Sequence, residues 1–117
     1  MGFNFEDLDV YNKAIDVVSD IYLLTKAFPK EEMFGLTSQL RRAAVSIPSN
    51  IAEGSARSKK EFSHFIDIVR GSVFECVTML QISFKQSYIN NEKFGDLKNK
   101  LTDLSKMLSG LKKSVNR

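Results

Sequence analysis

The sequence is poor in the residues that build extracellular, membrane-spanning and β-rich proteins. Its single cysteine, Cys76, excludes an intrachain disulfide framework and is typical of a reducing compartment. Two prolines and six glycines leave little room for a turn-rich β architecture. No apolar run approaches the roughly 20 residues of a membrane-spanning helix, and residues 1–7 lack the basic start and apolar core of a signal peptide. These absences favour a cytoplasmic protein with no membrane partner.

Motifs for catalysis and metal binding are equally scarce. The one histidine stands in a Glu61-x-x-His64 pattern, whereas di-metal bundles need two such motifs and further carboxylates. There is no glycine-rich phosphate loop and no dinucleotide fingerprint. Cys76 lies three helical turns from His64, too far for proton transfer between them. We therefore expect no enzyme and no cofactor, and a metalloenzyme is the least favoured alternative, testable by metal analysis.

The composition is that of one ordinary globular domain. The 117 residues are 43% hydrophobic and 26% charged, with a net charge of +3. The charge is unevenly distributed: residues 1–32 carry a local −4, residues 41–60 a local +4, and the chain from Lys93 onward a local +5. This asymmetry is compatible with an anionic partner and equally with solvated helix surfaces.

Apolar residues recur at helical spacing in four segments of a single domain spanning 1–117, approximately 7–28, 36–57, 59–88 and 91–114. Pro29 ends the first segment. Ser58 and Glu61 form a capping-box pattern before the third, and Asn90 is a candidate N-cap for the fourth. Four long helices with short connectors predict an all-α, antiparallel up-down-up-down four-helix bundle.

The second helix has an unusual outer face. Its core stripe is apolar and a narrow polar stripe flanks it, but the side opposite the core carries small residues where a solvated helix would show Lys and Glu. A neighbour within the chain or a second subunit would explain this face, and we favour a subunit interface, because a bundle buries only one side of each helix. The predicted interface residues are Ser38, Val45, Ser49, Ala52 and Ala56.

Two further features of these helices need an explanation. Pro48 removes one hydrogen bond inside the second helix and should kink it. Glu75 stands among apolar and small residues of the third helix, where an unpaired carboxylate would be costly. We expect an arginine to pair with Glu75, either Arg41 or Arg42, with Arg42 the residue we assign, and we interpret the pair as structural.

Cations cluster around the connector between the second and third helices. The connector leads into a helix N-terminus, where free amides and the helix dipole favour anions. No aromatic residues alternate with the cations, so base readout is not indicated, and an exposed solubilising turn is an equal alternative. The candidate nucleic-acid-binding residues are Arg41, Arg42, Arg57, Lys59 and Lys60.

The order of these motifs resembles a known family. The blocks Gln39-Leu40-Arg41-Arg42-Ala43-Ala44 and Asn50-Ile51-Ala52-Glu53-Gly54 are its most specific features, and they are accompanied by Phe28-Pro29, Glu32, Gly35-Leu36, Ser46-Ile47, Arg57, Phe62, Phe65 and Gly71-Ser72. Together they resemble the bacterial four-helix-bundle proteins first found encoded in intervening sequences of 23S ribosomal RNA genes. The resemblance extends from about Leu8 to Leu111. Two departures are Tyr11, where Trp is frequent, and Cys76-Val77, where Leu-Glu is more typical.

The resemblance implies a cyclic homopentamer. The chain is also similar to the accessory variability protein of diversity-generating retroelements, a basic pentamer that binds nucleic acid and a reverse transcriptase, so RNA, DNA or such a protein are the implied partners. The leading hypothesis is a non-catalytic pentamer that binds nucleic acid non-specifically through a basic surface. The rival is an oligomeric protein-interaction scaffold whose arginines form intersubunit salt bridges. Arginines paired with Glu53 or Glu75 in an interface favour the scaffold; arginines on an open surface favour nucleic acid.

Overall fold

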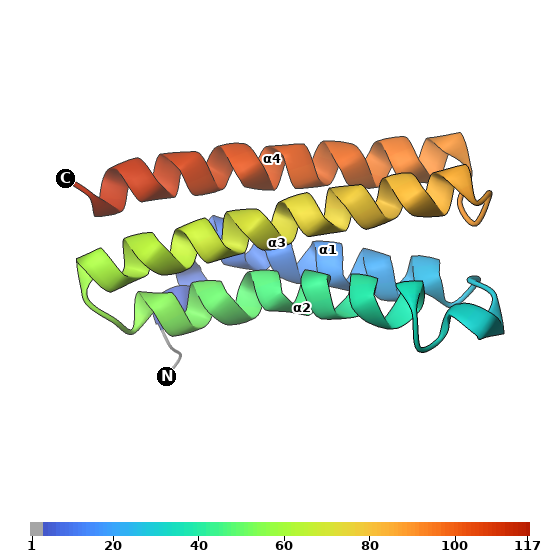
Figure 1. The fold of residues 1–117 in the computed structure, drawn as a ribbon. Helices are drawn as coiled ribbons and strands as arrows, with labels where there is room; N and C mark the ends of the chain where they lie inside the picture. Colours follow the sequence, from blue (N-terminus) through green and yellow to red (C-terminus); the bar gives the residue numbers. More distant parts are fainter. Residues whose placement is uncertain (1–3) are drawn as a thin grey trace.

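The computed structural model describes residues 4–117 and contains four α-helices; the first three residues of the expected 1–117 domain lie outside it. Consecutive helices are joined at alternating ends of the molecule, which gives the expected antiparallel four-helix arrangement (Figure 1). The molecule measures 44 × 24 × 22 Å. The elements are η1 (Asn4–Asp7), α1 (Asp9–Thr25), η2 (Lys30–Glu32), α2 (Leu36–Ser55), α3 (Lys59–Lys85) and α4 (Asn91–Val115).

Short-range capping fixes where α3 and α4 begin. The Ser58 hydroxyl accepts a hydrogen bond from the Glu61 amide at 3.2 Å and donates one to the Glu61 carboxylate at 3.0 Å. The Asn90 side chain accepts a hydrogen bond from the Lys93 amide at 2.8 Å. Both helices therefore start at the residues that the sequence indicates, since these side chains satisfy amides that the first helical turn leaves unpaired.

The helices end less predictably than they begin. Helices α1, α2 and α3 end two or three residues before the expected positions. After α3, Ser87 adopts a left-handed backbone conformation with φ of 65°. The Tyr88 amide then bonds to the Ser83 carbonyl at 2.9 Å and the Ser87 amide to the Phe84 carbonyl at 3.0 Å. These two bonds define a Schellman motif, which glycine usually completes.

The core is built from the apolar stripe of each helix. Leu101, Leu104 and Leu108 of α4 are fully buried, as their alternating spacing of three and four residues predicts. Helix α3 contributes Val69 and Leu80, both with no exposed surface. No helix in residues 4–117 combines the length and apolar character needed to cross a bilayer.

Helices α2 and α3 approach each other unusually closely near their connector. Gly54, in the last turn of α2, is buried against two aromatic residues of α3, and a Cβ atom there would lie 2.6 Å from the Cβ of Phe65 and 3.0 Å from Phe62. Farther along the same pair, the hydroxyls of Ser46 and Ser72 share a 2.6 Å hydrogen bond. Small side chains thus set the spacing between α2 and α3.

Candidate functional site

The small-residue face of α2 is open in the single chain. Ser38, Ser49 and Ala56 are exposed, Val45 is 38% exposed, and Ala52 is half-buried. On one side of this face α2 contacts α1, and on the other it contacts α3. No neighbour within residues 4–117 covers the four exposed positions, so the intrachain explanation for their small size does not hold. That a second subunit covers them remains a prediction.

Arg41 is engaged within the chain. Its Nε donates a hydrogen bond to the Thr25 hydroxyl at 2.8 Å, and its guanidinium lies 4.6 Å from the centre of the Tyr22 ring. Thr25 is itself buried and also donates to the Ile21 carbonyl. Arg41 therefore fastens α2 to the end of α1, and only part of its guanidinium is available to a ligand.

Arg42 and Glu75 line the same groove between α2 and α3, but they do not form the expected ion pair there. Among residues 4–117, no ion pair within 4.0 Å joins them. Both side chains are exposed rather than surrounded by apolar groups. The reason for expecting the pair was therefore wrong, because an exposed carboxylate keeps its hydration and needs no partner.

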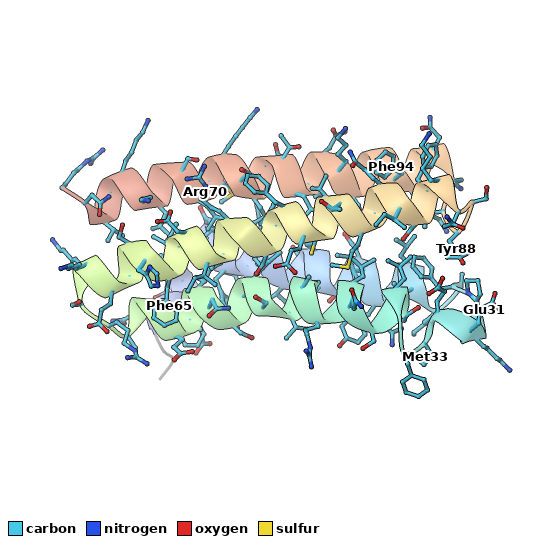
Figure 2. The ribbon with its side chains drawn as sticks, viewed as in Figure 1. Glu31, Met33, Phe65, Arg70, Tyr88 and Phe94 are labelled. Carbon is cyan, nitrogen blue, oxygen red and sulfur yellow. The ribbon has the colours of Figure 1, made fainter. Side chains whose placement is uncertain are left out.

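Arg57 is exposed but paired. Its guanidinium lies 3.0 Å from the Glu53 carboxylate and 3.6 Å from the Glu61 carboxylate, and 5.6 Å from the centre of the Phe65 ring. Phe65 projects from α3 toward α2 (Figure 2). Arg57 thus joins the end of α2 to the start of α3, and its charge is balanced by the two carboxylates.

Arg42, Lys59 and Lys60 are the three predicted cations that stay exposed with no ion-pair partner among residues 4–117. Arg42 lines the groove between α2 and α3, whereas Lys59 and Lys60 follow α2 in the chain. These two lysines begin α3, at the end of the bundle where α4 finishes (Figure 1). A 2.6 Å ion pair between Lys112 and Asp67 joins these two helices. The end of α4 adds exposed cations to the same region, so we define the α3–α4 basic end as Lys59, Lys60, Lys113 and Arg117.

The five predicted nucleic-acid-binding residues do not form one patch. Arg41 and Arg57 are 16 positions apart near opposite ends of α2, which separates them by about 24 Å at a rise of 1.5 Å per residue. The excess of Lys after Lys93 is evident in the sequence, but nothing local connects it to Lys59 and Lys60. The predicted antiparallel topology could have connected them, since it places the end of the fourth helix beside the start of the third.

Two features of the described residues concern metal binding and the single cysteine. Among residues 4–117 there is no group of three or more His, Cys, Asp or Glu side chains that could hold a metal ion. Cys76 is fully buried, and its burial, with a smaller contribution from Glu75, raises the pKa of the thiol to about 12. Because the thiolate is the reactive form, burial and the raised pKa both disfavour reaction at this cysteine.

The fold, the capped α3 and α4 and the open α2 face define a small antiparallel four-helix-bundle protein. The chain belongs to the 23S rRNA-intervening sequence protein family, whose model matches residues 6–110. It is similar to a solved structure from Bacteroides thetaiotaomicron VPI-5482, described as a protein of unknown function from the S23 ribosomal protein family. The two share 25% identity with a TM-score of 0.82, over 89% of this chain and 95% of the other. A comparison with curated proteins gave no match.

Proposed function

We propose that the protein is a non-catalytic homopentamer that binds the backbone of RNA or DNA, without sequence preference, through the α3–α4 basic end. The observation that carries the proposal is the gathering of Lys59, Lys60, Lys113 and Arg117 at one end of the bundle, exposed and without ion-pair partners among residues 4–117. Cations free of acidic partners release the counterions of nucleic acid on binding, which is the main source of non-specific affinity.

The open face of α2 supports self-assembly. Ser38, Ser49 and Ala56 leave a surface that another helix can approach closely, and Val45 adds apolar area to it. Family membership supports the same proposal, because the resemblance to this family implies a pentamer. Five copies at +3 each carry +15, so a ring repeats the basic end five times and raises its attraction for a polyanion.

A salt titration tests the nucleic-acid proposal. Fluorescence anisotropy with labelled single-stranded and duplex oligonucleotides should give affinities that fall linearly with log salt. The variant Lys59→Gln/Lys60→Gln should reduce the slope by about 0.9 for each duplex phosphate that the variant no longer neutralises. The matched control is Lys26→Gln/Lys30→Gln, which removes the same charge from the other end of the bundle and should leave the slope unchanged. Affinity that is independent of salt, or equal decreases in both variants, would contradict the proposal.

A second candidate function is an oligomeric protein-interaction scaffold that binds no nucleic acid. The pairing of Arg57 with Glu53 and Glu61 within the chain supports it, because the two carboxylates balance the charge that this arginine would offer to a polyanion. The engagement of Arg41 with Thr25 and Tyr22 is of the same kind. If the protein assembles but binds no oligonucleotide in the titration at low salt, the result would favour the scaffold function.

A further inference from the structure

The connector between α1 and α2 presents an aromatic side chain to solvent. Phe34 is 96% exposed, and Met33 beside it is 47% exposed. Tyr22 of α1 and Val45 of α2, 40% and 38% exposed, border the same hollow as Phe34. Ser38 also lines this hollow, together with Arg41 and Arg42, so the surface around Phe34 continues into the small-residue face of α2.

The backbone around Phe34 is held firmly in place. One oxygen of the Glu32 carboxylate accepts a hydrogen bond from the Leu36 amide at 3.3 Å, and the other accepts one from the Tyr88 hydroxyl at 2.9 Å. The Gly35 amide bonds to the Glu32 carbonyl at 3.0 Å. Glu32 thus ties the connector both to the start of α2 and to the segment after α3. Because this order is already established in the folded chain, little backbone freedom is left to lose when Phe34 meets a partner.

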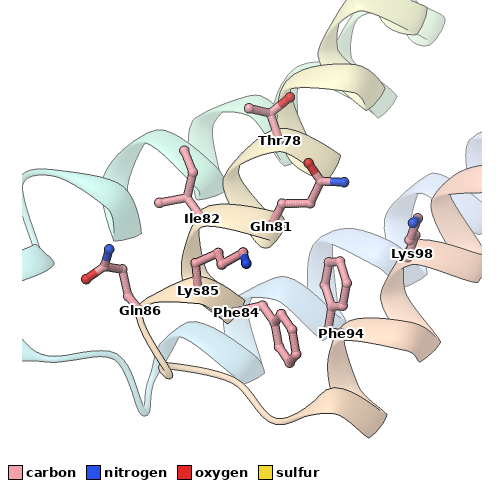
Figure 3. Close-up of a pocket in the computed structure, with 8 residues that line it drawn as sticks. All are labelled: Thr78, Gln81, Ile82, Phe84, Lys85, Gln86, Phe94 and Lys98. Carbon is pink, nitrogen blue, oxygen red and sulfur yellow. The ribbon is translucent and has the colours of Figure 1, made fainter.

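A groove that could receive an aromatic ring lies between α3 and α4. It has a volume of about 590 Å³, with Ile82 on one side and the stacked rings of Phe84 and Phe94, 5.0 Å between centres, on the other (Figure 3). Aromatic rings pack favourably against one another in offset or edge arrangements, and such pairs contribute beyond the area they bury. Thr78 and Gln81 give the groove a polar rim.

The groove is basic, whereas η2 of the connector carries two carboxylates and one lysine. Two lysines, Lys85 and Lys98, line the groove and no acidic residue among residues 4–117 does. The connector carries the exposed carboxylate of Glu31 three residues before Phe34. With Phe34 in the groove, η2 with its net charge of −1 (one lysine, two glutamates) would lie near a basic surface, and opposite charges across a contact fix its register and suppress wrong pairings.

We propose that Phe34 of one chain inserts into the α3–α4 groove of a second copy. Met33 and Glu31 project near the start of α2, whereas Phe94 lies on α4 on the other side of α3 (Figure 2). Phe34 and Met33, which we call the knob, and the α3–α4 groove are thus different surfaces of one chain. The contact between two copies is therefore head-to-tail. Its repetition closes a ring when the rotation between neighbouring subunits allows it. The proposal rests on the proposed self-assembly and names the surfaces that carry it.

The first test is the mass of the assembly. Light scattering over a concentration series should show the wild type as an oligomer and Phe34→Ala shifted toward monomer, with a dissociation constant raised about 30-fold or more, as for a truncated central anchor. The matched control is Leu23→Ala, which removes an apolar side chain that is 69% exposed on α1 and should leave the mass unchanged. A monomeric wild type would overturn the proposed self-assembly itself. An oligomeric wild type with an equally oligomeric Phe34→Ala would overturn only the role of Phe34.

The second test keeps the aromatic anchor and maps the contact. The variant Met33→Cys/Gln81→Cys places one thiol beside the knob and one at the rim of the groove, while buried Cys76 stays unreactive. Mild oxidation should produce a ladder of disulfide-linked chains on non-reducing gels, and the longest species gives the number of subunits in the ring. Each single variant should give no ladder. A linked dimer from Met33→Cys alone, or an oligomer whose double variant gives no ladder, would overturn the head-to-tail contact.

Discussion

Replacing Gly54 with alanine tests the close approach of α2 and α3. The added Cβ would lie 2.6 Å from the Cβ of Phe65 and 3.0 Å from both the Cγ of Phe65 and the Cδ1 of Phe62. Carbon atoms pack at about 3.5–4.0 Å, so the nearest contact is short by about 1 Å. The Cβ of Phe65 is bonded directly to the backbone, and a change of rotamer cannot move it away. The two helices must therefore shift apart near their connector.

The magnitude follows from two opposing contributions. Alanine is favoured over glycine inside a helix by about 1 kcal/mol. Overpacking a well-packed contact costs about 1–3 kcal/mol, and the upper part of that range applies at Gly54 because backbone has to move. We expect the free energy of unfolding of Gly54→Ala to fall by about 2 kcal/mol, the difference between these contributions.

Urea denaturation followed by circular dichroism measures this difference, at one fixed protein concentration because assembly would contribute to stability. The matched control is Gly110→Ala in α4, where a Cβ would have no neighbour within 4 Å; its stability should rise by about 1 kcal/mol. A Gly54→Ala protein as stable as the wild type would refute the close-approach reasoning. So would an equal destabilisation of both variants, since only one of them creates a clash.

Three other perturbations have defined outcomes. Ser87→Gly should stabilise the chain by about 1 kcal/mol in the same urea assay, because Ser87 has a φ of 65°, whereas Gln86→Gly next to it should not stabilise. Cys76, whose pKa is raised to about 12, should resist alkylation at pH 8 in the folded protein and react in denaturant; rapid labelling of the native chain would contradict its burial. The Lys112 hydrogen bond lowers the pKa of Asp67, so this pair stabilises the fold above the usual carboxyl pKa and the contribution disappears as pH falls through the lowered value. NMR titration should show the Asp67 pKa rising in Lys112→Ala, and an unchanged pKa would contradict the proposed effect of Lys112 on Asp67.

The sequence predicts the helices well where local chemistry decides them. The starts of α3 and α4 are set by Ser58 and Asn90, whose side chains cap the nearest free amides, and this information is contained in three or four residues. The end of α3 was harder to predict, because Ser87 takes a conformation that glycine normally supplies. The next residue, Tyr88, packs its ring against Phe28 with 5.5 Å between the ring centres, a tertiary contact that no local pattern reveals.

The candidate site depended more on the relative positions of helices. Glu53, Arg57 and Glu61 follow one another at four-residue steps, so their ion pairs could have been read from the sequence, although the helix break between them hides the pattern. The exposure of Arg42 and Glu75, which removes the need for a pair, could not be foreseen, because it depends on how the helices pack. Phe34 was missed because it falls in a short connector that carries no periodicity.

Each of the two sequence blocks that carry the family resemblance contains a residue whose contacts lie inside one chain. Arg41 bonds to Thr25 and lies over the Tyr22 ring, and Gly54 allows α2 to meet Phe65. A loss of binding in Arg41→Ala would therefore be ambiguous, since the substitution also releases α2 from the end of α1. Exposed residues outside those blocks avoid this ambiguity, because removing a solvated side chain leaves the packing intact. Assembly is consequently tested most directly at Phe34, and nucleic-acid binding at Lys59 and Lys60.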